Sequence, residues 1–207
     1  MLSVIQADLE SIDLHVDYEL IEKFSQLVKE HQKWNKVFNL SAHRADRDVQ
    51  IYQLIDSLTV HNHIKTGPCL DIGTGPGFPG LPLAMLFSTV EFTLLDASQK
   101  KLAFIRHIKA MFNLDNVVVT HSRVEDYQRT TLFPQIISRA FSRLDNLLGM
   151  CEPLLAEHGR VLAMKGRQID TEVSEIKNLN RAYKITIHEL PHVIDESRVL
   201  AIAELDK

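Results

Sequence analysis

The N-terminal part of the chain has the apolar spacing of helices packed on one face. Between residues 20 and 34, apolar side chains recur every three or four positions. The members of this stripe are Leu20, Ile21, Phe24, Leu27, Val28, His31 and Trp34. A second helix is predicted to begin near Asp46, whose carboxylate can cap it, and to run toward His61. Its inward positions are Val49, Tyr52, Ile55 and Leu58. Residues 1–64 are therefore expected to form a helical extension.

From residue 65 the pattern changes to short apolar runs separated by helical stretches. The apolar runs span residues 69–72, 90–95, 117–120, 135–138 and 161–164. The helical stretches lie near residues 80–87, 98–112 and 143–156. Alternation of this kind predicts a parallel sheet covered by helices on both faces. Right-handed crossovers then make the sheet doubly wound.

Two further strand-like runs, residues 182–190 and 197–205, follow near the end of the chain. The segment PHVIDE between them has no room for a crossover helix, so the two runs are predicted to pair as an antiparallel hairpin. A parallel α/β sheet that ends in such a hairpin is similar in topology to the class I methyltransferases. We therefore expect a Rossmann-like, mostly parallel α/β domain over residues 65–207.

Composition is that of an ordinary globular protein, with 45% apolar and 24% charged residues in 207. The N-terminus lacks the basic region of a secretory signal, and no apolar run approaches the ~20 residues of a membrane helix. Cys69 and Cys151 are the only cysteines, so no disulfide framework is indicated. His61, His63 and Cys69 lack a fourth ligand at a suitable spacing, so we expect no metal site. A reduced, cytoplasmic protein without membrane contact is predicted, and a monomer, since no hydrophobic interface stripe stands out.

Charge is distributed unevenly along the chain. A formal net charge of -4 argues against bulk electrostatic binding of nucleic acid, and residues 1–22 carry six acids and no Lys or Arg. Residues 29–47 carry five basic residues against two acidic ones. A local basic face of this kind can bind phosphate, with a solvated helix face as the alternative. The candidates for this role are Lys33, Lys36, Arg44 and Arg47.

The stretch DIGTGPGFPG, residues 71–80, places four glycines directly after the first predicted strand. Nucleotides bind to α/β sheets at this point, outside the carboxyl ends of the strands. A tight turn without a ligand is the alternative. Counted from Gly73, the dinucleotide pattern GxGxxG would place its third glycine at Phe78, so the register fails. A shifted match begins two residues into the loop and includes Pro79.

Acidic residues near this loop favour S-adenosylmethionine over a dinucleotide. Asp71 precedes the loop, where it would repel a pyrophosphate but would favour the ammonium and sulfonium of S-adenosylmethionine. Asp96 ends the second strand and can accept hydrogen bonds from both ribose hydroxyls, or cap the helix that follows. After the third strand, the backbone of Val124 and the carboxylate of Glu125 can read the adenine edge. The predicted contacts in the loop itself are Gly73, Gly75 and Gly77.

Taken together, these motifs resemble the bacterial 16S ribosomal RNA guanine-N7 methyltransferases, the glucose-inhibited division protein B family. The matching stretches are WNKVFNL (34–40), IDS (55–57), DIGTGPGFPG (71–80), LLD (94–96), SRVE (122–125), ISRAF (137–141) and MKG (164–166). They span nearly the whole chain. Where members often carry Arg-His before Leu-Asp-Ser, this chain has Tyr52 and Gln53.

The resemblance implies a class I methyltransferase fold and methylation of N7 of a guanine in 16S rRNA, as naked RNA or as part of the small ribosomal subunit. By the family pattern, S-adenosylmethionine would be contacted by Gly73, Phe78, Val124, Glu125 and Arg139.

The segment after the fourth predicted strand agrees with a ring nitrogen as methyl acceptor. Many amino-methylating enzymes carry Asn/Asp-Pro-Pro-Tyr/Phe there, whereas this chain has Ser138, Arg139, Ala140 and Phe141. Guanine N7 needs no base to remove a proton, so catalysis can rest on positioning. Arg139 is the predicted catalytic residue and would hold the methionine carboxylate or touch only O6, because N7 must stay free. A structural ion pair is the alternative for Arg139, and Phe141 is predicted to stack on the base.

RNA binding is predicted to involve the basic segment together with Arg123 and Lys165 at the rim of the cleft. Trp34 and Phe38 are expected in the core because of their helical spacing. Two other functions remain open at this point. A nicotinamide-dependent oxidoreductase is disfavoured by Asp71 and Phe78, and a non-catalytic ribosome-assembly factor is disfavoured by the intact glycine loop and both acids.

Overall fold

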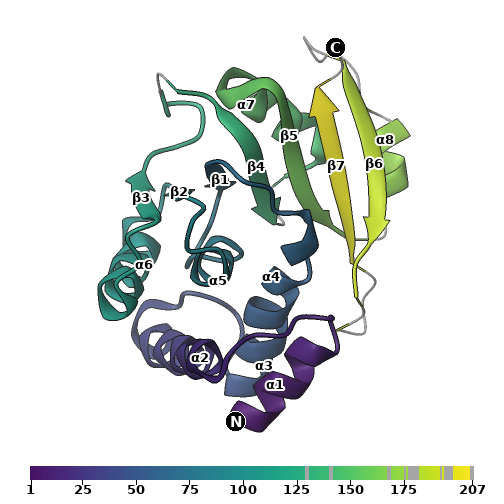
Figure 1. Ribbon diagram of the computed structural model, residues 1–207. Coiled ribbons are helices and arrows are strands. Elements are labelled where there is room, and N and C mark those ends of the chain that lie inside the picture. Colours follow the sequence, from purple (N-terminus) through teal and green to yellow (C-terminus); the bar gives the residue numbers. More distant parts are fainter. Residues whose placement is uncertain are drawn as a thin grey trace.

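The computed structural model describes residues 1–128, 131–139, 142–166, 169–174, 176, 182–191, 193 and 198–205. Within these residues the centre of the protein is a seven-stranded sheet with the order β3-β2-β1-β4-β5-β7-β6 (Figure 1). In chain order the strands are β1 (Cys69–Ile72), β2 (Phe92–Asp96), β3 (Val117–His121), β4 (Phe133–Arg139), β5 (Leu155–Lys165), β6 (Tyr183–Glu189) and β7 (Val199–Leu205).

Pairing in the sheet confirms the predicted topology. Strands β3, β2, β1, β4 and β5 are parallel, and β7 pairs antiparallel with both β5 and β6. The strand order reverses between β1 and β4, where Asp71 lies beside Ile137. Doubly wound sheets bind their ligands at such a switch point, at the carboxyl ends of the strands. The glycine loop leaves β1 at this edge.

Helices cover both faces of the sheet. On one face lie α5 (Gly80–Leu86) and α6 (Gln99–Phe112), and on the other lie α7 (Leu144–Cys151) and α8 (Ile169–Ser174). The predicted helix over 143–156 ends earlier than expected, because the 3-10 turn η3 (Glu152–Leu154) follows α7 and β5 already begins at Leu155. Helix α8 was not predicted.

Residues 1–64 form a helical extension, as predicted, although the helix over residues 2–10 was not expected. The segments are α1 (Leu2–Glu10), α2 (Tyr18–Phe38), α3 (Asp46–Val49), η1 (Gln50–Ile55), α4 (Asp56–Leu58) and η2 (His61–His63). Helix α2 is capped by Asp17, whose side chain accepts a hydrogen bond from the backbone N–H of Leu20 at 2.8 Å. The buried face of α2 follows the predicted stripe and includes Phe24, Leu27 and His31.

The second predicted helix contains a π-helical turn, η1, between α3 and α4. Val49, Ile55 and Leu58 are buried as expected, but Tyr52 is 38% exposed, so its inward placement was wrong. A π-helix forms its hydrogen bonds five residues along the chain instead of four. The wider turn rotates Tyr52 outward and Gln53 inward. Asp46 does not cap this helix through its side chain, since Ala45 occupies the cap position.

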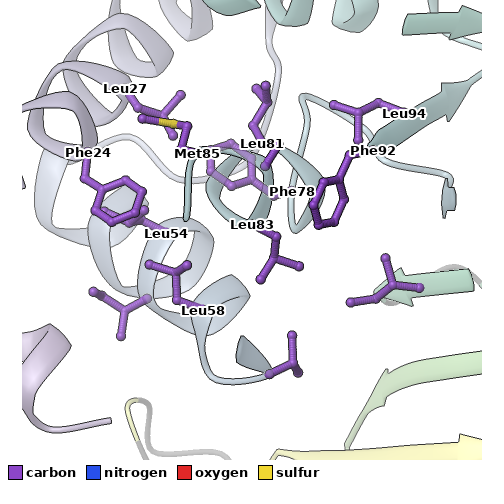
Figure 2. Close-up of a cluster of buried hydrophobic side chains, with 14 of the residues drawn as sticks. Phe24, Leu27, Leu54, Leu58, Phe78, Leu81, Leu83, Met85, Phe92 and Leu94 are labelled. Atoms are coloured by element: carbon purple, nitrogen blue, oxygen red, sulfur yellow. The ribbon is translucent and has the colours of Figure 1, made fainter. Parts of the chain in front are cut away.

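Both sides of the predicted boundary at residue 64 share one hydrophobic cluster. Figure 2 shows Phe24, Leu27, Leu54 and Leu58 of the N-terminal helices next to side chains of the glycine loop, α5 and β2. The members from that second group are Phe78, Leu81, Leu83, Met85, Phe92 and Leu94. The N-terminal helices are therefore packed onto the element that forms the ligand-binding edge of the sheet.

His31 lies inside this cluster, fully buried, with its ring edge-to-face against Phe78 and Phe104 at centroid distances of 5.7 Å. Neither ring nitrogen has a hydrogen-bond partner among the residues that the structure describes. Burial, assisted by the nearby His43, lowers the pKa of His31 from 6.5 to about 4. The unfolded chain therefore binds a proton more readily than the folded protein, so acidification through this range favours unfolding.

We expect His31→Leu to remove about 2 kcal/mol of the acid destabilisation that develops between about pH 7.5 and about pH 5. The free energy of unfolding of both proteins is measured with urea at the two pH values, and its change with pH is compared between variant and parent. That comparison is needed because burial raises the pKa of Asp71 to about 7, which gives the opposite slope in both proteins. His15→Leu, at an exposed histidine, is the control and should leave the pH dependence unchanged. Equal pH dependence in parent and His31→Leu would contradict the prediction.

The described part of the chain lacks two kinds of feature. It contains no helix long and apolar enough to cross a membrane. It also contains no group of three or more His, Cys, Asp or Glu side chains placed to hold a metal ion.

Candidate active site

A pocket opens at the carboxyl ends of β1, β2 and β3, at the edge predicted for ligand binding. Its lining includes four of the predicted cofactor contacts, Gly73, Asp96, Val124 and Glu125. The predicted RNA contact Arg123 also lines it. The structure thus brings together residues from three separate strand ends, which lie up to 52 positions apart in the chain, from Gly73 to Glu125.

Asp96 connects the two loops that frame the pocket. One carboxylate oxygen accepts the backbone N–H of Gly75 at 2.9 Å, and the other accepts that of Ser98 at 2.7 Å. The carboxylate thus joins the glycine loop to Ser98, and Ser98 instead of Asp96 holds the N-cap position of α6, so the predicted alternative of a helix cap was wrong. Each carboxylate oxygen can accept a second hydrogen bond, so ribose binding is chemically compatible with these contacts.

Glycine is required in this loop for two different reasons. At Gly77, φ is +95° and an added Cβ would lie 2.4 Å from Cδ1 of Leu81, so the side chain is excluded by the packing of α5. At Gly75, φ is +59°, but the nearest atom to an added Cβ is Nζ of Lys101 at 4.0 Å. The space over Gly75 is open, which suits close approach of a ligand. At position 77, packing within the protein is enough to explain why glycine is required.

Asp71 lies beneath the loop, whereas the sequence pattern placed it at the mouth of the loop. Its side chain is fully buried, and Oδ2 accepts hydrogen bonds from Oγ1 of Thr74 at 2.6 Å and from the backbone N–H of Gly80 at 2.8 Å. Burial raises the pKa of Asp71 to about 7. The carboxylate therefore joins β1 to the loop and to α5. The negative charge at the pocket comes instead from Asp96, which is half-buried, and from Glu125, which is exposed.

Phe78 is also directed inward. Only 3% of the residue is exposed, and its ring meets His31 in the hydrophobic cluster. Any contact of Phe78 with a cofactor would therefore have to involve its backbone. Phe78 was assigned to the cofactor from the family pattern. Its packing against the N-terminal helices is a second reason for a phenylalanine at this position.

Arg139 ends β4 and is held by the π-helical turn of the N-terminal helices. Its Nη1 donates to the backbone carbonyl of Tyr52 and to Oδ2 of Asp56, both at 2.9 Å, and Nη2 donates to Oε1 of Gln53. The ion pair with Asp56 corresponds to the structural alternative considered for Arg139. These bonds use three of the five N–H donors of the guanidinium toward residues that the structure describes.

Asp56 is the main site residue that sequence reasoning left without a role. It is 1% exposed and has a second cationic neighbour, since Nε of Arg198 lies 3.4 Å from its Oδ1. The stretch IDS was noted as part of the family pattern, so its acid was visible in the sequence. Its partners were not, because Asp56 and Arg139 are 83 residues apart.

The four basic candidates near the end of α2 differ in their surroundings. Lys33 is paired with Glu30 at 3.3 Å, and Arg47 binds both carboxylate oxygens of Asp8. Lys36 is exposed and has no carboxylate partner among the described residues. The guanidinium of Arg44 donates to uncharged acceptors on α2 and its C-cap, at 3.4 and 3.0 Å respectively. Among the described residues, no carboxylate neutralises Lys36 or Arg44, so these two are the better candidates for binding phosphate.

Four other residues were considered for contact with RNA, and the structure describes three of them. Lys165 is 9% exposed and its ammonium binds Glu172 at 2.9 Å, so the prediction that it stands at the open rim was wrong. Phe141 lies outside the described residues. Trp34 packs against Phe104 and His107, as expected for the core, whereas Phe38 is 40% exposed and its core placement was wrong.

Solved structures with a similar fold include methyltransferases. An rRNA methylase from Streptococcus thermophilus superposes with a TM-score of 0.54, at 14% identity, over 74% of this chain and 95% of that one. A putative S-adenosyl-L-methionine-dependent methyltransferase from Methanococcus maripaludis gives a TM-score of 0.54, at 18% identity, over 88% and 94% of the two chains. At these identities the likeness concerns the fold.

Closer relatives share the sequence over almost its full length. Ribosomal RNA small subunit methyltransferase G of Idiomarina loihiensis is 39% identical over 94% of this chain and 94% of its own. The protein of the same name from Legionella pneumophila is 35% identical over 99% and 96%. The family model GidB, described as rRNA small subunit methyltransferase G, matches residues 20–201. The chain belongs to this family, the rRNA small subunit methyltransferases G.

Proposed function

We propose that this protein transfers a methyl group from S-adenosylmethionine to N7 of a guanine in the 16S rRNA of the small ribosomal subunit. The observation that carries the proposal is the pocket at the ends of β1, β2 and β3, in a chain of this family. S-adenosylmethionine supplies an electrophilic methyl group. Guanine N7 has a free lone pair at neutral pH, so the protein has to bind and orient its two substrates but need not remove a proton.

Binding of S-adenosylmethionine is assigned to the pocket lining. Asp96 accepts hydrogen bonds from the ribose hydroxyls, with its orientation fixed by the backbone N–H groups of Gly75 and Ser98. The open space over Gly75 accommodates the close approach of the methionine part. Val124 and Glu125, on the loop after β3, read the adenine edge. Gly73 lines the same pocket, while Asp71, Gly77 and Phe78 support the loop from below.

Arg139 is the proposed orienting residue at the carboxyl end of β4. Its guanidinium keeps two N–H donors that are not used toward the described residues, and these can hold the methionine carboxylate or guanine O6. The two possibilities separate in kinetics. Loss of a carboxylate contact would raise the Kd for S-adenosylmethionine, whereas loss of an O6 contact would raise the KM for the subunit.

Contact with the RNA backbone is assigned to the exposed cations on either side of this edge. Lys36 and Arg44 are the main candidates in the N-terminal part, with Lys33 and Arg47 less available because carboxylates neutralise them. Arg123 stands at the pocket itself. Binding through phosphates weakens steeply with salt, so substitution of Lys36 or Arg44 should reduce the salt dependence of subunit binding. We further propose that the protein acts as a cytoplasmic monomer.

The test is transfer of tritium from labelled S-adenosylmethionine to small subunits that lack the modification, followed by nucleoside analysis. A peak of 7-methylguanosine in 16S rRNA is expected from the parent protein, with a loss of at least tenfold in Arg139→Ala. Lys23→Gln, which disrupts the exposed pair with Glu19, is the control and should retain full activity. Label in another nucleoside or in protein would contradict the proposed reaction.

A further inference from the structure

The π-helical turn η1 presents one aromatic ring to the outside of the protein. Tyr52 is 38% exposed, whereas its neighbours Gln53 and Leu54 are buried. The wide π turn turns the tyrosine side chain outward while its backbone carbonyl accepts a hydrogen bond from Arg139 at 2.9 Å. The backbone and the side chain of this one residue therefore have separate environments.

His43 holds this ring in a fixed plane. The two rings are parallel within 6°, and their centroids lie 4.8 Å apart. Such a stack covers one face of the tyrosine, and the exposed area remains for a second planar partner. Burial is the main cause that lowers the pKa of His43, with Arg139 acting in the same direction and Asp48 against it. The imidazole is therefore a neutral aromatic ring at neutral pH.

Cations lie close to this pair of rings. Arg44 follows His43 in the chain, is exposed, and binds only uncharged acceptors among the described residues. Arg139 donates to the carbonyl of Tyr52, and its charge is paired with the buried Asp56. An exposed aromatic ring next to an exposed guanidinium group has the composition of sites that bind single-stranded nucleic acid, in which the ring stacks on a base and the cation meets a phosphate.

Tyr52 is also connected to the edge of the sheet at which the pocket opens, the carboxyl ends of the strands. Arg139 is the last residue of β4, and the preceding Ser138 donates a hydrogen bond to the carbonyl of Ile72 at 3.0 Å, directly before Gly73 of the pocket. Tyr52 is thus joined by one hydrogen bond to the strand end that adjoins the S-adenosylmethionine pocket. A base that approaches this pocket from the β4 side would pass the ring.

We propose that the ring of Tyr52, backed by His43, is a stacking platform for a nucleobase of the rRNA substrate. The proposal rests on the proposed function and adds a base-contacting residue to it. The platform is sequence-tolerant, since every base offers a flat face. It therefore acts on RNA affinity and placement, and the choice of the methylated atom remains with the groups around Arg139.

The test compares Tyr52→Leu with Tyr52→Phe in binding to unmethylated small subunits. Both variants keep the backbone carbonyl that Arg139 uses, and only leucine lacks a flat face. We expect the Kd for subunits to rise about tenfold in Tyr52→Leu and to stay within about twofold of the parent in Tyr52→Phe. The Kd for S-adenosylmethionine should be unchanged in both, since the ring does not line that pocket.

Three results would overturn the proposal. Subunit binding by Tyr52→Leu equal to that of the parent would exclude any role of the ring, and equal weakening of both variants would indicate the hydroxyl instead. A defect on subunits that is absent on protein-free 16S rRNA would assign the ring to a ribosomal protein. This test measures subunit binding and not methylation. If the proposed target base were wrong, the nucleoside analysis of the parent protein would show it, and the binding comparison between the two Tyr52 variants would still be valid.

Discussion

Asp56→Ala is expected to lower the free energy of unfolding by about 3–5 kcal/mol, the cost of removing one partner from a buried ion pair. Asp56 is 1% exposed and lies between two guanidinium groups, Arg139 at 2.9 Å and Arg198 at 3.4 Å. Without the carboxylate, both cations remain partly buried and lose their main electrostatic partner. The change should appear in urea unfolding as a lower midpoint with an unchanged slope.

Two controls separate this effect from a general loss of charge. Arg198→Gln leaves the closer pair between Asp56 and Arg139 intact, so we expect a cost of about 1 kcal/mol. Lys23→Gln removes an exposed ion pair with Glu19 and should change stability by less than about 0.5 kcal/mol. A loss below about 1 kcal/mol in Asp56→Ala would show that the cluster contributes little to the fold.

Asp56 also connects stability with activity. Its carboxylate belongs to the N-terminal helices, whereas Arg139 belongs to the sheet, so the pair fixes the proposed orienting residue from outside the Rossmann-like part. Gln53, in the preceding π turn η1, adds a second side-chain acceptor. The N-terminal helices therefore complete the site, in addition to any RNA contact through Lys36 and Arg44.

Gly80→Ala is expected to destabilise the protein by about 3 kcal/mol and to weaken binding of S-adenosylmethionine at least tenfold. An added Cβ would lie 2.1 Å from Cδ2 of Leu94 and 2.7 Å from Oδ2 of Asp71. Both neighbours are fully buried, so neither can move without disturbing the core. The same Oδ2 accepts the backbone N–H of Gly80, and the resulting shift should reach the glycine loop through Thr74.

Gly149→Ala is the matched control, because this glycine lies in helix α7 and an added Cβ would meet nothing within 4 Å. Alanine is the better helix former, so this variant should be as stable as the parent or more stable by up to about 1 kcal/mol. Thermal or urea unfolding and calorimetric titration with S-adenosylmethionine measure both effects. Parent-like stability and affinity in Gly80→Ala would contradict the packing argument for the loop.

The strand and helix pattern was readable from the sequence because each element carries its own apolar period. The run CLDI was predicted as a strand at residues 69–72 and is β1, and the stripe from Leu20 to Trp34 is the buried face of α2. The C-terminal hairpin followed from the short connection between its two runs. These are local properties, and a one-dimensional pattern contains them.

Side-chain direction at the site was less predictable. Asp71 and Phe78 were both recognised as important, yet both lie beneath the loop, in contacts with Gly80 and His31. Tyr52 was placed inward by helical periodicity, and the π turn rotated it outward. Lys165 was placed at the rim, and Glu172 holds it inside. In each case a partner or a local change in helix geometry outweighed the average spacing.

By itself the sequence determined the class of fold and the family, and it predicted a ligand site at the glycine loop and Asp96, because these depend on residue types at short spacings. Only the tertiary structure decided which groups face the pocket and which support it. Arg139 meets Asp56 across 83 residues, and Asp96 meets Gly75 across 21. Such contacts arise when separate elements pack against one another, and no periodicity along the chain encodes which buried polar group will satisfy which.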